Sequence, residues 1–173
     1  MSAWFSGFDQ ISFATDDLDR AIGFWERQMG VGPWTVFRGL TLAMRFENRQ
    51  IALPSHVAVA WHDGRVVELI QVVGDGPSPF HDALNRPIVG LQRLASVTAE
   101  IERDAMAAEA RGMERFAEGE AAGQRFVYFR SPEAPGLLLE LLERTPMFDS
   151  LVEGLKARCG AFAPPVQPSR SAR

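Results

Sequence analysis

The chain has 173 residues, of which 46% are apolar and 23% charged, and its formal net charge is −4. This composition predicts a packed globular core, and the acidic balance excludes the broad basic face that nucleic-acid binding needs. No apolar run approaches the roughly 20 residues that cross a bilayer, so we expect no membrane partner. Cys159 is the single cysteine, so no disulfide can form within the chain, and we expect a cytoplasmic protein.

The first half of the chain alternates between strand and helix signals. Asp16 or Asp17 offers an N-cap to the helix that follows the first strand, and Gly30 fits the left-handed position after a helix. Asp63-Gly64 is typical of a two-residue hairpin turn. The expected elements are a strand over 8–15, a helix over 18–29, a short strand over 34–38, a long irregular loop or hairpin over 40–54, and strands over 56–62 and 65–73.

The second half repeats these signals after a Gly/Pro-rich linker. Gly112 ends a second helix, and Thr145-Pro146 predicts the start of a C-terminal helix with one apolar face. The expected elements are a short helix over 80–84, a strand from about 90, a helix over about 99–111, a short strand near 116, strands over 125–130 and 137–142, and the C-terminal helix.

The two halves match when the chain is aligned with itself. Gln10-Ile11-Ser12 falls on Arg93-Leu94-Ala95 and Thr15 on Thr98, while Val67-Glu68-Leu69-Ile70 falls on Leu139-Glu140-Leu141-Leu142 at a smaller shift. We therefore predict an α+β fold in which two βαβββ modules pack together. The expected division is a first module over 1–74, a linker over 75–89, a second module over 90–145, a helix over 146–162 and a disordered tail over 163–173.

The repeat places one glutamate at the same point of each module. Glu68 and Glu140 each lie within an apolar strand, where an isolated buried carboxylate is costly unless it is paired or ligates a cation. Equivalent positions in two copies indicate one shared site, which the first strands face through Gln10 and Arg93.

Four stretches of the chain carry a resemblance to a known family. They are FDQISFATDDLDRAIGFWERQMGVGPW, VVELIQVVGDGPSPF, GLQRLASV and LLLELLE. The chain resembles the vicinal oxygen chelate superfamily, which includes glyoxalase I, methylmalonyl-CoA epimerase, extradiol dioxygenases and bleomycin-resistance proteins. The phrases GVGPW, VELIQ and GPSPF are most similar to the subgroup containing methylmalonyl-CoA epimerase. The resemblance implies that the two βαβββ modules form a curled mixed sheet around a central cavity that holds a metal, often in a homodimer.

The same resemblance identifies where this chain departs from the metal-binding pattern. In metal-binding members the first strand of each module offers a His and the last strand a Glu; Glu68 and Glu140 match the glutamates, whereas Gln10 and Arg93 stand at the histidine positions. Arginine has no lone pair to give to a metal. We therefore expect no cofactor, and the hypothesis is that the Arg93 guanidinium lies between the two carboxylates in place of the metal. The alternative is a divalent ion held by Gln10, Glu68 and Glu140.

Further side chains are candidates for contact with a substrate, each with a plainer structural alternative. Gln10, His56 and Tyr128 could face the pocket, and Trp34 and Trp61 could form an apolar wall, or all of these could simply pack. His81 could rim the pocket from the linker. The arginines around the irregular stretch could meet an anionic substrate or form a solvated loop; they are Arg38, Arg45 and Arg49.

The leading functional hypothesis is a metal-independent isomerase, epimerase or lyase that acts on a small organic carbonyl compound. Glu68 and Glu140 would transfer protons, and Arg93 would stabilise negative charge developing on oxygen. The alternatives are a non-catalytic small-molecule binding protein of the drug-resistance type, a metal-dependent epimerase, and a purely structural ion pair.

Overall fold

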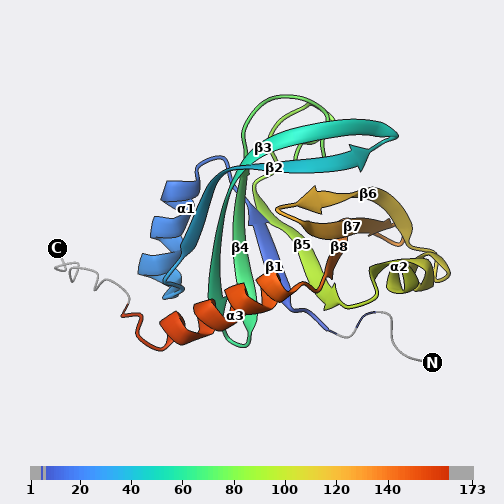
Figure 1. The fold of residues 1–173 in the computed structure, drawn as a ribbon. Coiled ribbons are helices and arrows are strands. Elements are labelled where there is room, and N and C mark those ends of the chain that lie inside the picture. Colours follow the sequence, from blue (N-terminus) through green and yellow to red (C-terminus); the bar gives the residue numbers. More distant parts are fainter. Residues whose placement is uncertain (1–4, 6, 164–173) are drawn as a thin grey trace.

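The computed structural model describes residue 5 and residues 7–163, and the predicted tail beyond 163 lies outside them. Within these residues the elements form two βαβββ series followed by a helix (Figure 1). The first series contains β1 (Gln10–Ala14), α1 (Leu18–Phe24), a π-helical turn (Trp25–Met29), β2 (Thr35–Phe46), β3 (Arg49–His62) and β4 (Arg65–Val72). The second contains β5 (Gly90–Thr98), α2 (Ile101–Glu109), β6 (Glu114–Ala121), β7 (Gln124–Ser131) and β8 (Ala134–Glu143), and α3 (Pro146–Cys159) follows it. The predicted α+β fold with a βαβββ repeat is confirmed.

The strands close into one barrel in the order β1-β4-β3-β2-β6-β7-β8-β5. The two series meet at two antiparallel seams, β1 against β5 and β2 against β6. Within each series the first strand is parallel to the last, because a helix carries the chain across between them. The series are therefore related by an approximate twofold axis that passes through the β1–β5 seam.

Short-range signals fix the ends of the helices. Asp17 caps α1 by accepting the Arg20 N–H at 2.9 Å, and Gly30 ends the π-helical turn in the left-handed conformation, with φ of 67°. Thr145 caps α3 by accepting the Phe148 N–H at 3.1 Å, with Pro146 at the first helical position. These three features agree with the sequence predictions. No helix in the described residues is both long enough and apolar enough to span a bilayer.

The stretch over 40–54 is a regular hairpin and not the irregular loop that we considered. Strands β2 and β3 pair from Thr35↔Val59 to Phe46↔Arg49 around a tight turn, in which Glu47 and Asn48 both have positive φ. Pro54 is compatible with the strand because the ladder between β3 and β4 only begins at Ser55↔Val72. A bulge between Phe37 and Leu40 breaks the alternation, which is why the pattern looked irregular.

The linker does not contain the expected short helix over 80–84. Asp82 accepts the N–H groups of Leu84 and Arg86 at 2.9 Å each, and Asn85 has φ of 58°. The Asp side chain thus stabilises a turn in competition with a helix. The turn lets Phe80 insert its ring into the core, where the ring is only 3% exposed.

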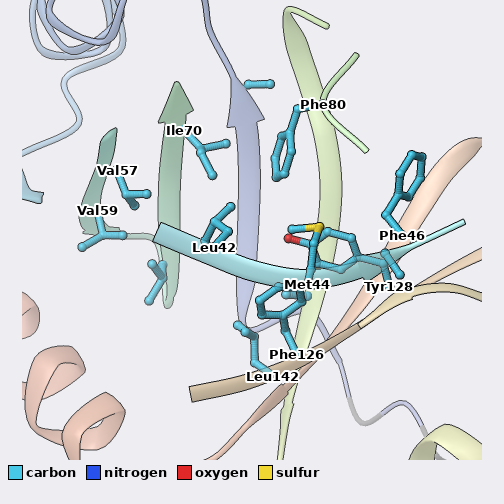
Figure 2. Packing of buried hydrophobic residues seen from close by; sticks show 14 of the residues in the cluster. Leu42, Met44, Phe46, Val57, Val59, Ile70, Phe80, Phe126, Tyr128 and Leu142 are labelled. Atoms are coloured by element: carbon cyan, nitrogen blue, oxygen red, sulfur yellow. The ribbon is translucent and has the colours of Figure 1, made fainter. Parts of the chain in front are cut away.

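Buried apolar side chains fill part of the barrel interior and leave the rest open. Figure 2 shows them converging from both series, with Met44 of β2 beside Tyr128 and Phe126 of β7. Outside the barrel, α1 packs through Leu18 on Ala58 and Leu69, and α2 packs on β7 and β8. Both helices thus pack on the outer surface of the barrel and leave its interior free of helices.

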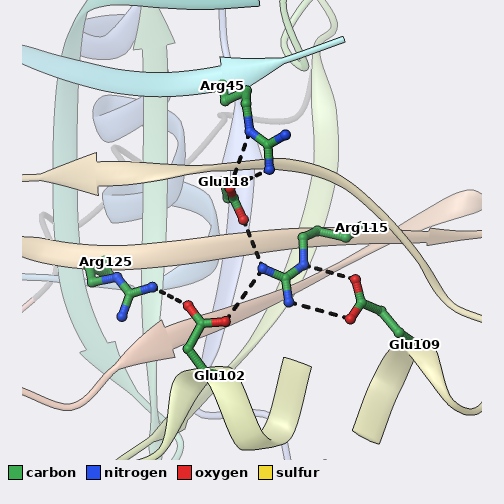
Figure 3. A network of polar contacts seen from close by, with 6 residues as sticks. All are labelled: Arg45, Glu102, Glu109, Arg115, Glu118 and Arg125. Atoms are coloured by element: carbon green, nitrogen blue, oxygen red, sulfur yellow. Dashed lines mark hydrogen bonds and ion pairs between the residues drawn. The ribbon is translucent and has the colours of Figure 1, made fainter. Parts of the chain in front are cut away.

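The β2–β6 seam depends on a close backbone approach at one glycine. A Cβ added to Gly119 would lie 2.2 Å from the Ala43 carbonyl oxygen and 2.7 Å from the Met44 Cα. Across the same seam, Glu118 of β6 accepts hydrogen bonds from Arg45 of β2 at 2.5 Å, and it also accepts from Arg115 at 2.8 Å. These arginines lower the pKa of Glu118. Figure 3 shows the network continuing from Arg115 to Glu109 and Glu102 and on to Arg125.

Gly119→Ala should therefore destabilise the protein by about 1–3 kcal/mol, because a backbone oxygen cannot move aside as a side chain can. Chemical denaturation measures the change in free energy of unfolding. Gly136→Ala on β8 is the matched control, since a Cβ there meets no atom within 4 Å. Equal stability of the two variants would show that the seam does not need this glycine.

Candidate functional site

The centre of the barrel holds a guanidinium between two carboxylates. Arg93 Nη2 donates to Glu68 Oε1 and Arg93 Nε donates to Glu140 Oε2, each at 2.6 Å. The side chains of Arg93 and Glu140 are 4% and 2% exposed, and that of Glu68 is 12% exposed. Gln10 Nε2 donates to the other oxygen of Glu68 at 3.2 Å. The structure thus brings together the four side chains that the repeat grouped.

Strand register explains why these residues meet. Ser12 of β1 lies opposite both Arg93 of β5 and Glu68 of β4. Ala95 of β5 likewise lies opposite both Gln10 and Glu140 of β8. Because side chains on one face of neighbouring strands are adjacent, the four polar groups converge at the β1–β5 seam on the inner face.

Two further partners of Arg93 were not predicted from the sequence. Gln92 Oε1 accepts from Arg93 Nη1 at 2.7 Å, while Gln92 Nε2 donates to the Pro79 carbonyl at 3.2 Å. Gln92 has no pairing partner on β1, because Ser12 pairs with Arg93 and the next residue, Phe13, pairs with Leu91. This bulge allows two consecutive side chains to point inward, and no residue pattern in the sequence signals it.

Aromatic rings enclose the guanidinium. The Arg93 Cζ atom lies 5.2 Å from the centre of the Tyr128 ring and 5.7 Å from that of the Phe80 ring. Both distances allow a cation–π interaction, which is stronger in a desolvated site. Tyr128 was a predicted pocket residue, whereas the inward position of Phe80 depends on the linker turn.

The electrostatics of the site set the protonation of its members. Burial raises the pKa of Glu140 to about 7 against the opposing charge of Arg93, and the Glu68 carboxylate adds to the rise. Burial works to lower the pKa of Arg93, but the charges of the Glu140 and Glu68 carboxylates outweigh it, so the pKa lies above its ordinary value. Burial also raises the pKa of Tyr128 well above its usual range. The guanidinium therefore stays charged, while Glu140 exchanges a proton near neutral pH.

A cavity of about 450 Å³ opens beside this cluster. Its charged lining groups are Glu68, Arg93 and Glu140, joined by the polar side chains of Gln10 and Tyr128. The remaining lining is mostly apolar and comes from β2, β3, β4, β7, β8 and α3; it includes Phe37, Leu40, Leu42, Val57, Val59, Ile70, Phe126, Leu142, Phe148 and Leu151. Such a lining, with few polar groups at one end, is typical of a small-molecule site.

The structure does not bring every predicted contact residue to this cavity. His56 Nδ1 accepts the Gly39 N–H at 3.0 Å, on the strand face opposite to Val57. Trp34 packs on the outer side of the barrel with Phe13 and Trp25. Trp61 lies at the end of β3, where Lys156 Nζ is 4.9 Å from its ring centre. These three side chains are not part of the cavity lining. Each one either points to the other face of its strand or lies too far along the chain from the cavity.

The linker histidine and the arginines also lie elsewhere. His81 Nδ1 is 2.7 Å from Ser78 Oγ within the linker turn. Arg38 pairs with the exposed Asp19, Arg45 belongs to the seam network, and Arg49 is exposed at the hairpin tip. The described cavity lining contains none of these four residues.

The donor set at the centre fits a divalent ion poorly. Glu68, Glu140 and Gln10 could offer oxygens, but the guanidinium already occupies the position between the two carboxylates. A second cation there would meet a fixed positive charge at contact distance. Among the described residues, no group of three or more His, Cys, Asp or Glu side chains is arranged to hold a metal.

A barrel of paired βαβββ modules with its polar site at the seam between them defines a class of small-molecule-handling proteins. A model of the Glyoxalase/Bleomycin resistance protein/Dioxygenase superfamily matches residues 9–129. The chain belongs to this superfamily, as its resemblance implied. No curated protein sequence matches the chain.

Solved structures share the fold at low sequence identity. A hypothetical protein from Bacillus halodurans is 18% identical with a TM-score of 0.57, covering 80% of this chain and 94% of its own. Methylmalonyl-CoA epimerase from Mycobacterium tuberculosis is 17% identical with a TM-score of 0.56, covering 87% and 95%. A Streptomyces coelicolor methylmalonyl-CoA epimerase variant is 18% identical with a TM-score of 0.51, covering 82% and 99%. The subgroup suggested by the sequence motifs is thus among the structural neighbours.

Proposed function

We propose that this protein is a metal-independent isomerase or epimerase that moves a proton on a small organic carbonyl compound. The observation that carries the proposal is the Arg93 guanidinium, 2.6 Å from an oxygen of each carboxylate. A fixed organic cation at this point can stabilise negative charge on a substrate oxygen, as a metal would. The epimerases among the structural neighbours support proton transfer as the reaction class.

The proposed reaction begins with removal of the proton next to the substrate carbonyl. Glu140 takes this proton, since its pKa of about 7 matches a general base at neutral pH. The electron pair left by the C–H bond moves onto the carbonyl oxygen, which becomes an enolate. Arg93 has five N–H groups, of which three donate to Gln92, Glu68 and Glu140. The other two are the proposed donors to the enolate oxygen.

Return of the proton completes the reaction. Glu68 and Glu140 flank the guanidinium from strands of different modules. Glu140 can return the proton that it removed, which restores the original configuration. For inversion, Glu68 first takes a proton from solvent and gives it to the other side of the enolate, and Glu140 then releases its own proton to solvent.

A binding protein without catalysis is the second candidate. It is favoured by the two ion pairs that hold Arg93 between Glu68 and Glu140 and by the mostly apolar cavity wall. Both candidates expect a bound carbonyl compound, and they differ in whether its C–H bond is broken.

Exchange of solvent deuterium into the ligand separates the candidates. In D₂O, the purified protein treated with EDTA should incorporate deuterium next to the carbonyl of a bound compound, measured by NMR with 4-phenyl-2-butanone and methylmalonyl-CoA as the first probes. Glu140→Gln should lower this rate by about 10²–10⁴-fold. Glu143→Gln on the same strand, outside the cavity, is the matched control.

The pH dependence follows from the raised pKa of Glu140. The base is active when ionised, so the exchange rate should rise with pH through about 7 and level off above it. The Glu140→Gln variant should lack this inflection. Binding without exchange would support the non-catalytic candidate, while loss of exchange with EDTA and its recovery with a divalent ion would contradict metal independence.

A further inference from the structure

Helix α3 forms one wall of the cavity and is held firmly in place. Met147, Phe148 and Leu151 lie among the lining residues. At the other end of the helix, Arg158 donates to Thr35 and Lys156 lies over the Trp61 ring. Figure 1 shows α3 lying across the strands near one end of the barrel. The helix is therefore a fixed part of the site and not a peripheral appendage.

A niche in the first module also anchors the chain after α3. A Cβ added to Gly32 would lie 2.7 Å from the Phe162 ring, so the absence of a side chain at this position makes room for the ring. With Thr145 capping one end and Phe162 docked beyond the other, the apolar face of α3 has a defined position over the cavity. The wall can therefore discriminate between ligands by shape and polarity.

The charges around the cavity do not suit an anion. Its charged lining groups sum to −1 with both carboxylates ionised, and Arg93 is already bonded to each of them. Three arginines could have met phosphate groups. Arg38 and Arg45 face Asp19 and Glu118 instead, and Arg49 is exposed at the hairpin tip outside the cavity lining. An anionic ligand would thus lose hydration and make the net charge of the lining more negative. Arg93 could offer it two N–H groups, but the guanidinium charge is already balanced by two carboxylates.

From these observations we infer that the ligand is an uncharged carbonyl compound with an apolar group, and not a carboxylate or a coenzyme A thioester. The inference rests on the proposed function for the carbonyl group, which would lie near Arg93 and Gln10. The apolar group would lie against Phe148 and Leu151 of α3 and against Leu40 of the hairpin. The volume of about 450 Å³ is near the lower end of ligand pockets and suits a compact aromatic or branched aliphatic group.

A matched series of ligands tests this inference. The probes are 4-phenyl-2-butanone with related ketones of smaller and larger apolar groups, 3-phenylpropionate, and 3-phenylpropionyl-CoA. At equal concentration, at least one ketone should raise the melting temperature and bind roughly tenfold or more tightly than the carboxylate and the thioester, because of the net negative charge. Equal or tighter binding of the carboxylate or the thioester overturns the inference, and so does a series in which no ketone binds.

Variants of α3 test whether this helix contributes to ligand affinity and selectivity. Leu151→Ala should weaken binding of the ketone by roughly tenfold through lost apolar contact. Ser150→Lys, at an exposed position that borders the cavity, should improve binding of 3-phenylpropionate relative to the parent protein. Glu153→Gln, outside the lining, is the control and should leave both affinities unchanged. Unchanged affinities in all three variants would contradict the role of α3.

The failure of this inference can be told apart from failure of the proposed function. A ketone that binds without deuterium exchange contradicts catalysis but supports the assigned ligand class. A thioester that binds and exchanges contradicts the ligand class but supports catalysis.

Discussion

Replacing Arg93 with methionine should lower the free energy of unfolding by about 3–5 kcal/mol at pH 8, because it leaves two buried carboxylates without their cation. In the parent protein the guanidinium lies 2.6 Å from an oxygen of each, and the pKa of Glu140 is already raised to about 7. Without Arg93, the carboxyl group of Glu140 should bind its proton still more tightly in the folded state than in the unfolded state. Urea denaturation followed by circular dichroism measures the loss.

The sign of the pH dependence provides a second measurement on the same variant. A group whose pKa is raised by folding stabilises the folded state while protonated and loses that contribution as the pH rises. The deficit of Arg93→Met should therefore be smaller at pH 5 than at pH 8. A deficit that stays constant between these values would show that lost packing, and not uncompensated charge, causes it.

Removal of all three charges provides the control for this prediction. The combination Glu68→Leu, Arg93→Met and Glu140→Leu should recover most of the stability, since buried ion pairs are often replaceable by apolar side chains of similar volume. Arg93→Lys should lie between the parent protein and Arg93→Met, because it keeps the charge but not the planar array of donors. A deficit of less than about 1 kcal/mol in Arg93→Met would contradict the ionised state of the two carboxylates.

Replacing Gln10 and Arg93 together with histidine should create a divalent-metal site. The variant would present two imidazoles and two carboxylates at the centre of the barrel, the set that the superfamily resemblance associates with metal binding. Nitrogen and carboxylate oxygen ligands suit Co²⁺ and Zn²⁺. With metal at a hundred times its dissociation constant, stability should rise by about 2.7 kcal/mol.

Thermal denaturation with and without Co²⁺, together with the visible absorption of bound Co²⁺, measures the gain. Gln10→His alone retains the guanidinium between the carboxylates and should gain no tight site, which makes it the matched control. Tight Co²⁺ binding by the parent protein at Glu68 and Glu140 would show that Arg93 does not take the place of a metal.

Much of the fold could be predicted because its signals are local or repeated. The N-cap at Asp17, the turn at Asp63-Gly64 and the helix start at Thr145-Pro146 each depend on a few neighbouring residues. The hairpin over 35–62 was harder, since a bulge and Pro54 interrupt an otherwise alternating pattern. Strand β2 of this hairpin pairs with β6. Because the sequence left both a loop and a hairpin open over 40–54, it could not show which strands meet at this seam.

Some residues of the candidate site could also be predicted from the sequence, and others could not. The repeat placed Glu68, Glu140, Gln10 and Arg93 in one cluster, and all four meet in the structure. Gln92 and Phe80 escaped notice because a bulge and an irregular turn decide their direction. Trp34 and Trp61 were predicted to line the cavity from their residue type alone. In the structure Trp34 packs outside the barrel, and Trp61 lies at the end of a strand.

The sequence by itself determined the two-module plan and the charged centre, because duplicated strands carry equivalent residues to one axis. Only the tertiary structure decided that β2 meets β6, that α3 covers the cavity, and that the arginines of the hairpin lie outside it. These features depend on contacts between residues far apart in the chain, whose geometry follows from backbone approach, as at Gly119, and not from any local pattern.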